Sequence, residues 1–266
     1  MKALVTGVAG QLGHDVMNEL ARRGYEGIGS DIKETYSGIQ DGTAVVSMPY
    51  VQMDITDEDS VRKVLTDAAP DVVVHCAAWT AVDLAEDEDK KEIVYAVNAT
   101  GTKNIADVCK ELDCKMVYLS TDYVFDGQGT EAWQPDCKDY KPLNVYGETK
   151  LAGELAVSET LTKYFIVRIA WVFGKNGKNF IKTMLNIAKT HDKIKVVNDQ
   201  IGTPTYTFDI LDKIHGKSCL FHVPLIIGLH KISSGIPVNS RLDDAKPFDS
   251  AYVLFNFYLS HVNRSP

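Results

Sequence analysis

Short apolar runs alternate with longer amphipathic stretches along the first two-thirds of the chain. The apolar runs predict strands at residues 2–6, 24–29, 50–53, 71–76, 115–119 and 164–169. Between them, apolar positions recur at helical spacing and predict helices at residues 11–23, 57–69, 87–112 and 144–162. Solidly apolar strands that alternate with helices are typical of a parallel sheet covered on both faces. We therefore expect an α/β fold with a doubly wound parallel sheet.

A glycine-rich turn connects the first predicted strand to the first predicted helix. Glycine lets the backbone approach a pyrophosphate, whose charge the helix N-terminus stabilises. The spacing is GxxGxxG rather than GxGxxG, so a tight strand–helix turn that binds nothing stays an alternative. We predict a Rossmann-like NAD(P)-binding domain over residues 1–169. Its expected cofactor contacts in this turn are Gly7, Gly10, Gln11, Leu12 and Gly13.

Asp31 lies at the end of the second predicted strand and bears on the choice of cofactor. A carboxylate there can accept hydrogen bonds from both ribose hydroxyls of an adenosine, and it would repel a 2′-phosphate. This favours NAD(H), although Lys33 could soften the repulsion and permit NADP(H). A solvated turn residue is the alternative for Asp31. Further expected contacts with the adenine and the pyrophosphate follow the third and fourth strands, at Asp54, Ile55, Ala77 and Ala78.

Tyr146 and Lys150 lie four residues apart in a predicted helix, so both project from one face. This helix follows the fifth strand and a long loop that includes Thr121. Reduction of a ketone needs a hydride on carbon and a proton on oxygen. A tyrosine normally titrates near pH 10, and a neighbouring ammonium such as Lys150, together with the positive nicotinamide of the oxidised cofactor, would lower that pKa. We predict that Thr121 aligns a substrate carbonyl, that Tyr146 transfers the proton and that Lys150 also holds the cofactor ribose; a packed tyrosine and a solvated lysine are the alternative.

The composition narrows the class of protein. Of 266 residues, 45% are hydrophobic and 24% are charged, which is ordinary for a globular protein. The net charge of −8 disfavours a general nucleic-acid or membrane-surface binder. Five cysteines without a CxxC pair indicate reduced thiols, and no signal peptide precedes the first strand. We expect a cytoplasmic protein without nucleic-acid or membrane partners.

Seven segments together carry a family pattern. They are TGVAGQLG (6–13), AVD (81–83), STDYVFDG (120–127), YGETKLAGE (146–154), RIAWVFG (168–174), NF (179–180) and DQIGTPT (199–205). Over about residues 1–210 the chain resembles the extended short-chain dehydrogenase/reductases and, within them, the dTDP-4-dehydrorhamnose reductases. The resemblance implies that the C4 ketone of dTDP-4-dehydro-L-rhamnose is reduced to give dTDP-L-rhamnose.

The same resemblance implies roles for individual residues. Thr121, Tyr146 and Lys150 would be the catalytic trio. Trp171 would pack on the sugar, with a core aromatic as the alternative. Substrate contacts are also expected at Val124, Phe125, Asn179 and Gln200. Some members bind magnesium, but no ligand set carries over, so we predict no metal-binding residues; a homodimer stays open.

Two other functions stay open. Related dehydratases place a second acid after the threonine–acid pair, whereas Tyr123 follows Asp122 here, and epimerases usually carry a serine-rich segment at this point. An epimerase or dehydratase acting on another nucleotide sugar is therefore a weaker alternative. The other alternative is a non-catalytic dinucleotide-binding subunit that regulates a partner enzyme, against which the intact trio argues.

The predicted substrate-binding portion, residues 170–266, departs from the family pattern after about residue 210. Our hypothesis is an internal loss or an altered reading frame between about residues 211 and 235, and again near the end, which leaves an altered or shortened small C-terminal lobe. Reading the coding DNA in three frames tests it. The histidines and the cysteine of this stretch fit no familiar zinc spacing; they are His215, Cys219, His222 and His230.

Overall fold

The computed structural model describes the backbone and side chains of most residues up to 210. The described residues are 1–36, 38, 48–129, 133–191, 193, 194, 196, 202, 204–208 and 210, with the backbone alone at 225–228. Those up to Gly177 and from Gly202 onward belong to one larger compact unit, and those within Lys178–Ile201 to a smaller one. The division at residues 1–169 and 170–266 stays a prediction, because most of the second part lies outside the described residues.

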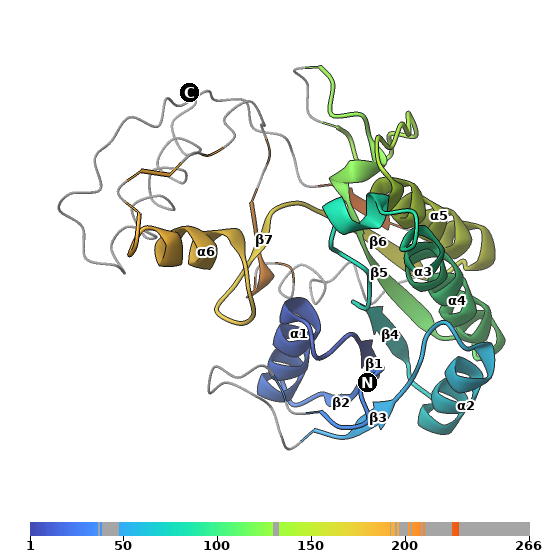
Figure 1. The fold of residues 1–266 in the computed structure, drawn as a ribbon. Coiled ribbons are helices and arrows are strands. Elements are labelled where there is room, and N and C mark those ends of the chain that lie inside the picture. The colour runs from blue at the N-terminus through green and yellow to red at the C-terminus, as the bar shows by residue number, and fades with distance from the viewer. Residues whose placement is uncertain are drawn as a thin grey trace, which may run out of the picture. The chain divides into compact units, whose positions relative to one another are not determined.

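Seven of the described strands form one parallel sheet in the larger unit (Figure 1). Their order is β3-β2-β1-β4-β5-β6-β9, with bounds β1 Lys2–Thr6, β2 Glu26–Asp31, β3 Tyr50–Gln52, β4 Val72–His75, β5 Lys115–Thr121, β6 Tyr164–Ile169 and β9 Leu225–Gly228. From β1 the chain adds strands first on one side (β2, β3) and then, from β4 onward, on the other side. This change of side between β1 and β4 makes the sheet doubly wound, as the sequence predicted. The strand β9 was not expected from the sequence, and the altered tail proposed there otherwise lies outside the described residues.

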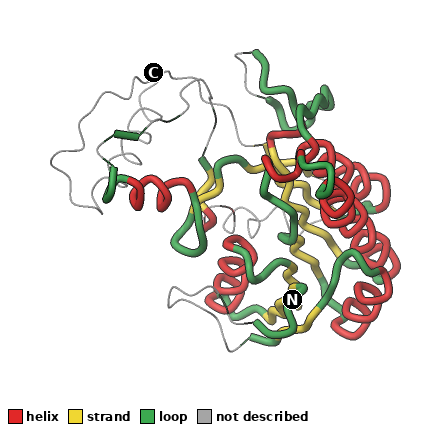
Figure 2. Tube along the Cα trace, viewed as in Figure 1, coloured by secondary structure: helices red, strands yellow, loops and turns green. Residues whose placement is uncertain are grey.

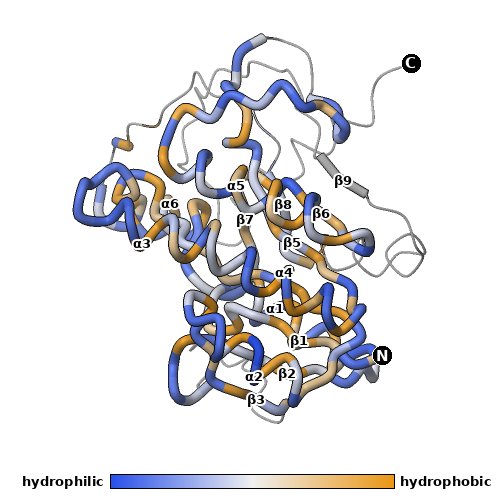
Figure 3. Tube along the Cα trace, turned by 90° about the vertical axis from the view of Figure 1, so that its right-hand side faces the viewer, coloured by the Kyte–Doolittle hydropathy of each residue, from blue (hydrophilic) through white to orange (hydrophobic). Residues whose placement is uncertain are grey.

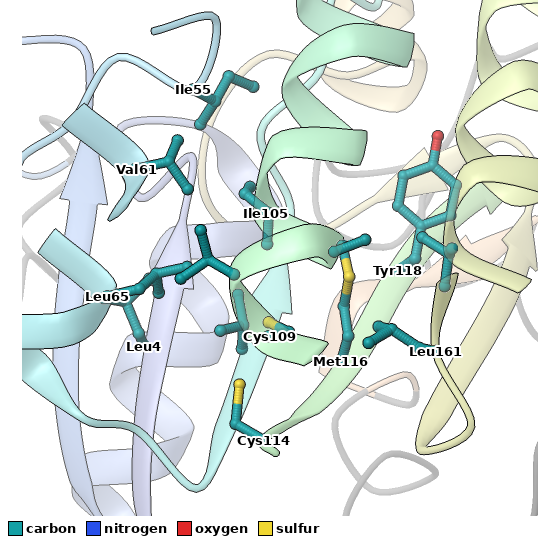
Figure 4. Close-up of a cluster of buried hydrophobic side chains, with 14 of the residues drawn as sticks. Leu4, Ile55, Val61, Leu65, Ile105, Cys109, Cys114, Met116, Tyr118 and Leu161 are labelled. Carbon is teal, nitrogen blue, oxygen red and sulfur yellow. The ribbon is translucent and has the colours of Figure 1, made fainter. Parts of the chain in front are cut away.

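The helices cover both faces of the sheet because successive strand residues point to opposite sides. On β1 and β4, Leu4 and Val73 pack with α2 (Glu58–Ala68), α4 (Gly101–Glu111) and α5 (Val145–Thr160). The following residues, Val5 and Val74, pack with α1 (Gln11–Arg22) on the other face. Figure 4 shows the first of these two cores, and Figure 3 shows the hydrophobic stretches of β1 and β5 that supply them.

Capping residues explain where two of the helices, which are red in Figure 2, begin. Asp57 accepts hydrogen bonds from the backbone of Asp59 (3.0 Å) and Ser60 (3.3 Å) at the start of α2. Asn144 accepts one from Gly147 N (2.7 Å) at the start of α5. Side-chain caps of this kind satisfy backbone donors that the first helical turn leaves without partners. The predicted helices at 57–69 and 144–162 are thus confirmed, with slightly shorter ends.

The helix predicted over residues 87–112 is confirmed in part. A 3-10 turn η1 (Asp83–Glu86) precedes it, and the helix itself runs from Lys91 to Glu111 as α3 (Lys91–Tyr95), a π-helical turn η2 (Ala96–Thr100) and α4. Asn98 in the π turn is buried and donates its amide hydrogens to Trp79 O and to Thr149 Oγ1, both at 3.1 Å. A π turn holds one more residue than an α-helical turn, and here it coincides with the long-range hydrogen bonds of Asn98. The spacing of apolar residues along the sequence could not reveal these bonds.

Smaller elements complete the description. In the larger unit, β7 (Val172–Phe173) pairs in parallel with β8 (Thr205–Tyr206), and a 3-10 turn η3 spans Asp122–Val124. In the smaller unit, Asn179 accepts a hydrogen bond from Lys182 N (3.1 Å) and so caps α6 (Phe180–Ile187). Over the described part of the chain, every helix falls short of the length and apolar character that a membrane crossing demands.

Candidate active site

Four predicted site segments follow the carboxyl ends of parallel strands. The glycine turn follows β1, Ala77 and Ala78 follow β4, Thr121 ends β5, and Trp171 follows β6. Because β1, β4, β5 and β6 are neighbours in one parallel sheet, all four ends lie at the same edge. In such sheets this edge is where ligands bind, next to the point where the strand order reverses.

The glycine turn is packed too tightly for any side chain at its first position. Gly7 has a φ of +71°, and a Cβ there would lie 2.6 Å from Ala77 N. Gly13 sits against the Gly7 carbonyl, so a side chain at Gly13 would also collide with the turn. Gly10 is the exposed N-cap residue of α1 and has no capping side chain. The turn therefore leaves the N-terminus of α1 open to an anionic group, with Gln11 and Leu12 in its first turn.

A buried hydrogen-bond chain sets the position of Ala77 opposite Gly7. Thr6 Oγ1 accepts from Cys76 N (3.2 Å) and Ala77 N (3.1 Å), and its own hydrogen goes to His75 Nδ1 (2.7 Å). His75 Nε2 then donates to Thr102 Oγ1 (3.1 Å), which donates to Asn98 O (2.7 Å). Burial lowers the pKa of His75 to about 3, so the imidazole is neutral. Polar Thr6 and His75 inside apolar strands were the signal that sequence reasoning passed over.

The Asp31 carboxylate is held in place by the backbone. Its Oδ2 accepts a hydrogen bond from Ala9 N (3.0 Å) in the glycine turn, and its Oδ1 accepts one from Ile32 N (2.9 Å). These bonds tie the end of β2 to the turn after β1. Asp31 is therefore not a freely solvated turn residue.

Asp54 and Ile55, which follow β3, are partly buried and buried, respectively. The Asp54 carboxylate accepts from Thr56 N (2.9 Å) and Thr56 Oγ1 (2.7 Å), which closes the turn before α2. Ile55 is buried against the backbone of Gly101. Both lie at the expected strand end, and their contact with an adenine stays a prediction.

Thr121 and Tyr146 are brought together at the end of β5. The Thr121 hydroxyl donates to Asp122 Oδ1 (3.1 Å) and accepts from Tyr123 N (3.2 Å). Tyr146, in the first turn of α5, lies close enough to Thr121 for that hydroxyl to influence its pKa, and it packs edge to face on Tyr123 with the ring centres 5.8 Å apart. Burial raises the pKa of Tyr146 to about 12, while the Thr121 hydroxyl opposes the rise and Asp122 adds to it.

Lys150 lies one helical turn beyond Tyr146 and is buried, with 2% of its surface exposed. Its Nζ donates to Leu119 O (2.7 Å) and stands 4.1 Å from the centre of the Tyr118 ring. Burial lowers the pKa of Lys150 to about 7, and the negative Glu154 opposes the fall. The lysine is thus a buried, strongly perturbed amine and not a solvated surface residue.

One expectation about this pair was wrong. Lys150 was expected to lower the pKa of Tyr146, yet the pKa of the phenol is raised. The reason is that the partly buried phenol loses hydration, while the lysine nitrogen is directed at the Leu119 carbonyl. Within the protein itself, desolvation outweighs any attraction between the ammonium and a phenolate.

Val124 and Phe125 point inward. Val124 is fully buried, and the Phe125 ring stacks on Trp133 with the ring centres 4.5 Å apart. Their side-chain placement does not support the prediction that they contact a substrate. Between these two residues and α5, the chain forms a loop that Arg168 anchors.

Arg168 and Glu154 form a buried ion pair, with exposed fractions of 3% and 2%. Arg168 Nε donates to Glu154 Oε1 (2.8 Å) and its Nη2 to Oε2 (2.7 Å). The same guanidinium donates to Pro135 O (3.2 Å) and to Tyr140 Oη (3.1 Å). One cation therefore ties the loop before α5 to both α5 and β6, and sequence reasoning did not foresee this pair.

Trp171 is not a core aromatic, because 47% of its surface is exposed. Its φ of +47° is unfavourable for a residue with a side chain, and its ring lies against the backbone of Gly202. Asn179 caps α6 in the smaller unit, and its substrate contact stays a prediction. Gln200 lies outside the described residues.

The comparisons with known proteins agree on one family. A family model described as RmlD substrate binding domain matches residues 1–216. The dTDP-4-dehydrorhamnose reductase of Streptomyces griseus is 40% identical over 212 residues, which are 79% of this chain and 63% of that protein. The Mycolicibacterium smegmatis protein of the same name is 37% identical over 252 residues, which are 92% of this chain and 67% of that one.

A solved structure agrees with these relatives. The dTDP-4-dehydrorhamnose reductase of Bacillus anthracis, in complex with NADP, is 38% identical and has a TM-score of 0.70. The match covers 80% of this chain and 69% of that one. The chain spans only 63% of the length of the Streptomyces griseus relative, but the family model covers most of the chain itself. The chain belongs to the RmlD substrate binding domain family.

Proposed function

We propose that the chain is an NAD(P)H-dependent reductase that converts the C4 ketone of dTDP-4-dehydro-L-rhamnose to the alcohol of dTDP-L-rhamnose. The observation that carries the proposal is the phenol of Tyr146 within reach of the Thr121 hydroxyl, one helical turn before the buried amine of Lys150. The names of the Streptomyces griseus and Mycolicibacterium smegmatis relatives support this choice of substrate.

Thr121, Tyr146 and Lys150 would each have a separate role in the reduction of the ketone. A bound NADH or NADPH would supply the hydride to the carbonyl carbon. Thr121 would donate a hydrogen bond to the ketone oxygen and align it. Tyr146 would give that oxygen its proton, and its pKa of about 12 keeps the phenol protonated at neutral pH, which is the form that reduction requires. Lys150 would hold the ribose of the cofactor through its buried amine.

The test is incubation of the purified chain with dTDP-4-dehydro-L-rhamnose and either NADH or NADPH. Loss of nicotinamide absorbance together with formation of dTDP-L-rhamnose, identified by mass spectrometry and NMR, is the expected result. Cofactor binding without oxidation would instead favour the regulatory subunit. Interconversion of sugars without net oxidation would favour an epimerase. Magnesium stays an expectation from the family resemblance alone.

The tight packing of the glycine turn leads to a prediction about the affinity for NADH. Gly7→Ala would place a methyl group on the Ala77 backbone, so we expect the dissociation constant for NADH to rise about tenfold or more. Gly24→Ala is the matched control, because Gly24 has a similar φ of +73° but no atom within 4 Å of a Cβ. It should lower stability by about 1 kcal/mol and leave cofactor affinity unchanged. Fluorescence titration and thermal unfolding measure both, and equal affinity losses in the two variants would contradict the assignment.

The position of Asp31 leads to a prediction about the preference between NADH and NADPH. We propose that NADH is preferred, because the backbone holds the Asp31 carboxylate where it would accept a ribose hydroxyl and repel a 2′-phosphate. Asp31→Ser keeps an acceptor for Ala9 N but removes the charge. The ratio of kcat/KM for NADPH to that for NADH should rise about tenfold or more. Lys33→Ala should lower the ratio, and an unchanged ratio in Asp31→Ser would count against the preference.

A further inference from the structure

The helix α1 carries a buried carboxylate, Asp15, that is not part of the catalytic trio. Asp15 is fully buried, and its Oδ1 accepts a hydrogen bond from the side-chain amide of Asn176, which is 2% exposed. The two residues are 161 positions apart in the sequence. The bond joins the helix that begins at the cofactor turn to the segment that follows β7.

The second oxygen of Asp15 and another buried polar atom both lie near Gly174. Neither Asp15 Oδ2 nor Thr207 Oγ1, both buried, has a hydrogen-bond partner among the described protein atoms. Gly174 lies beside both atoms, since a Cβ there would be 3.2 Å from Asp15 Oδ2 and would collide with Thr207 Oγ1. Burying polar atoms that are only partly satisfied is costly. Such violations of local rules are expected at functional positions.

The segments that meet Asp15 also determine where Trp171 stands. β7 pairs with β8, with Val172 opposite Thr205, and Thr205 N donates to Trp171 O (3.3 Å). Past β7, Gly177 lies against Gln11, the first residue of α1. Contacts therefore run from the first turn of α1 through Asn176 and β7 to the backbone of Trp171. This path accounts for how an exposed tryptophan is held at an unfavourable φ.

We propose that Asp15 is a positioning residue. Through Asn176 and the β7–β8 pair, it fixes the position of Trp171 relative to the cofactor-binding glycine turn. The proposal rests on the proposed function only in that Trp171 faces the sugar. The Asp15–Asn176 bond then aligns the sugar with the turn that binds the cofactor. Misplacing a group that orients a substrate by about 1 Å can lower the rate by about 10²-fold.

The test exchanges the two side chains. Asn176→Asp places two carboxylates together, Asp15→Asn removes the charge but keeps an acceptor, and the double variant Asp15→Asn/Asn176→Asp restores an amide–carboxylate pair of reversed polarity. Each protein is labelled with 5-fluorotryptophan and examined by ¹⁹F NMR. The chain has three tryptophans, and loss of one signal in Trp171→Phe assigns that residue.

The expected result is specific to Trp171. Its resonance should shift or broaden strongly in Asn176→Asp, less in Asp15→Asn, and return in the double variant, while the signals of Trp79 and Trp133 stay in place. The KM for the keto sugar should rise about tenfold in Asn176→Asp and recover in the double variant, while the dissociation constant for NADH changes less than about twofold.

The control is Glu19→Gln, which alters another buried carboxylate of α1. Glu19 pairs with Arg22 and Arg23, so this variant should lower stability without moving the Trp171 resonance. If Asn176→Asp fails to fold, Asn176→Ala takes its place and should also shift the Trp171 signal. An unmoved Trp171 signal in every single variant, or a double variant no better than Asn176→Asp, overturns the proposal. Because the NMR signal needs no turnover, failure of the proposed function would be seen separately in the assay of the unaltered chain.

Discussion

Replacing Tyr146 with phenylalanine should lower kcat for reduction of the keto sugar by about 10²-fold or more. The substitution removes the Tyr146 hydroxyl, which lies beside Thr121 and holds its proton at neutral pH. The ring and its edge-to-face packing on Tyr123 are kept, so the fold and the affinity for NADH should change little. Stopped assays of product and a fluorescence titration of NADH measure the two effects.

The matched control is Tyr95→Phe. Tyr95 is exposed, and its hydroxyl donates to Glu148 (3.2 Å) on the outer side of α5. Loss of that hydrogen bond should leave kcat within about twofold of the starting value, as is usual for surface substitutions. Retention of more than about a tenth of the activity in Tyr146→Phe would mean that another group gives the proton.

Replacing Arg168 with methionine should lower the free energy of unfolding by about 3–5 kcal/mol. The change leaves the buried carboxylate of Glu154 without its cation and removes the donors that hold Pro135 O and Tyr140 Oη. The guanidinium also lies over the Phe125 ring, 5.1 Å from its centre, so a cation–π contact is lost as well. Denaturant unfolding followed by circular dichroism measures the loss.

The double variant Arg168→Met/Glu154→Leu separates charge from packing. With both partners apolar, no carboxylate is left buried without its guanidinium, so the loss of stability should be smaller than in Arg168→Met. Activity should stay low in both variants, because both release the loop that leads into the first turn of α5, where Tyr146 lies. Equal stability losses in the single and double variants would show that the unpaired Glu154 is not the cause.

Local patterns determined the layout of the fold. The apolar runs predicted β1 and β6 at their observed bounds, since a strand covered on both faces needs little besides apolar side chains. The helices predicted from residues 57 and 144 begin within one residue of those positions, because a side-chain cap is a contact within a few residues. Long-range contacts were not predictable in this way: the hydrogen bonds of Asn98 accompany a π turn inside the helix expected at 87–112, and the spacing of apolar residues did not reveal that turn.

By itself, the sequence determined which groups stand at the carboxyl edge of the sheet, because the order of strands and turns delivers the glycine turn, Thr121 and Tyr146 there. Only the tertiary structure decided what surrounds them. The burial that lowers the pKa of Lys150, the pairing of Arg168 with Glu154 and the bond between Asp15 and Asn176 all join segments distant in the chain. Desolvation and pairing energies depend on which atoms meet in space, and no periodicity or motif within one segment carries that information.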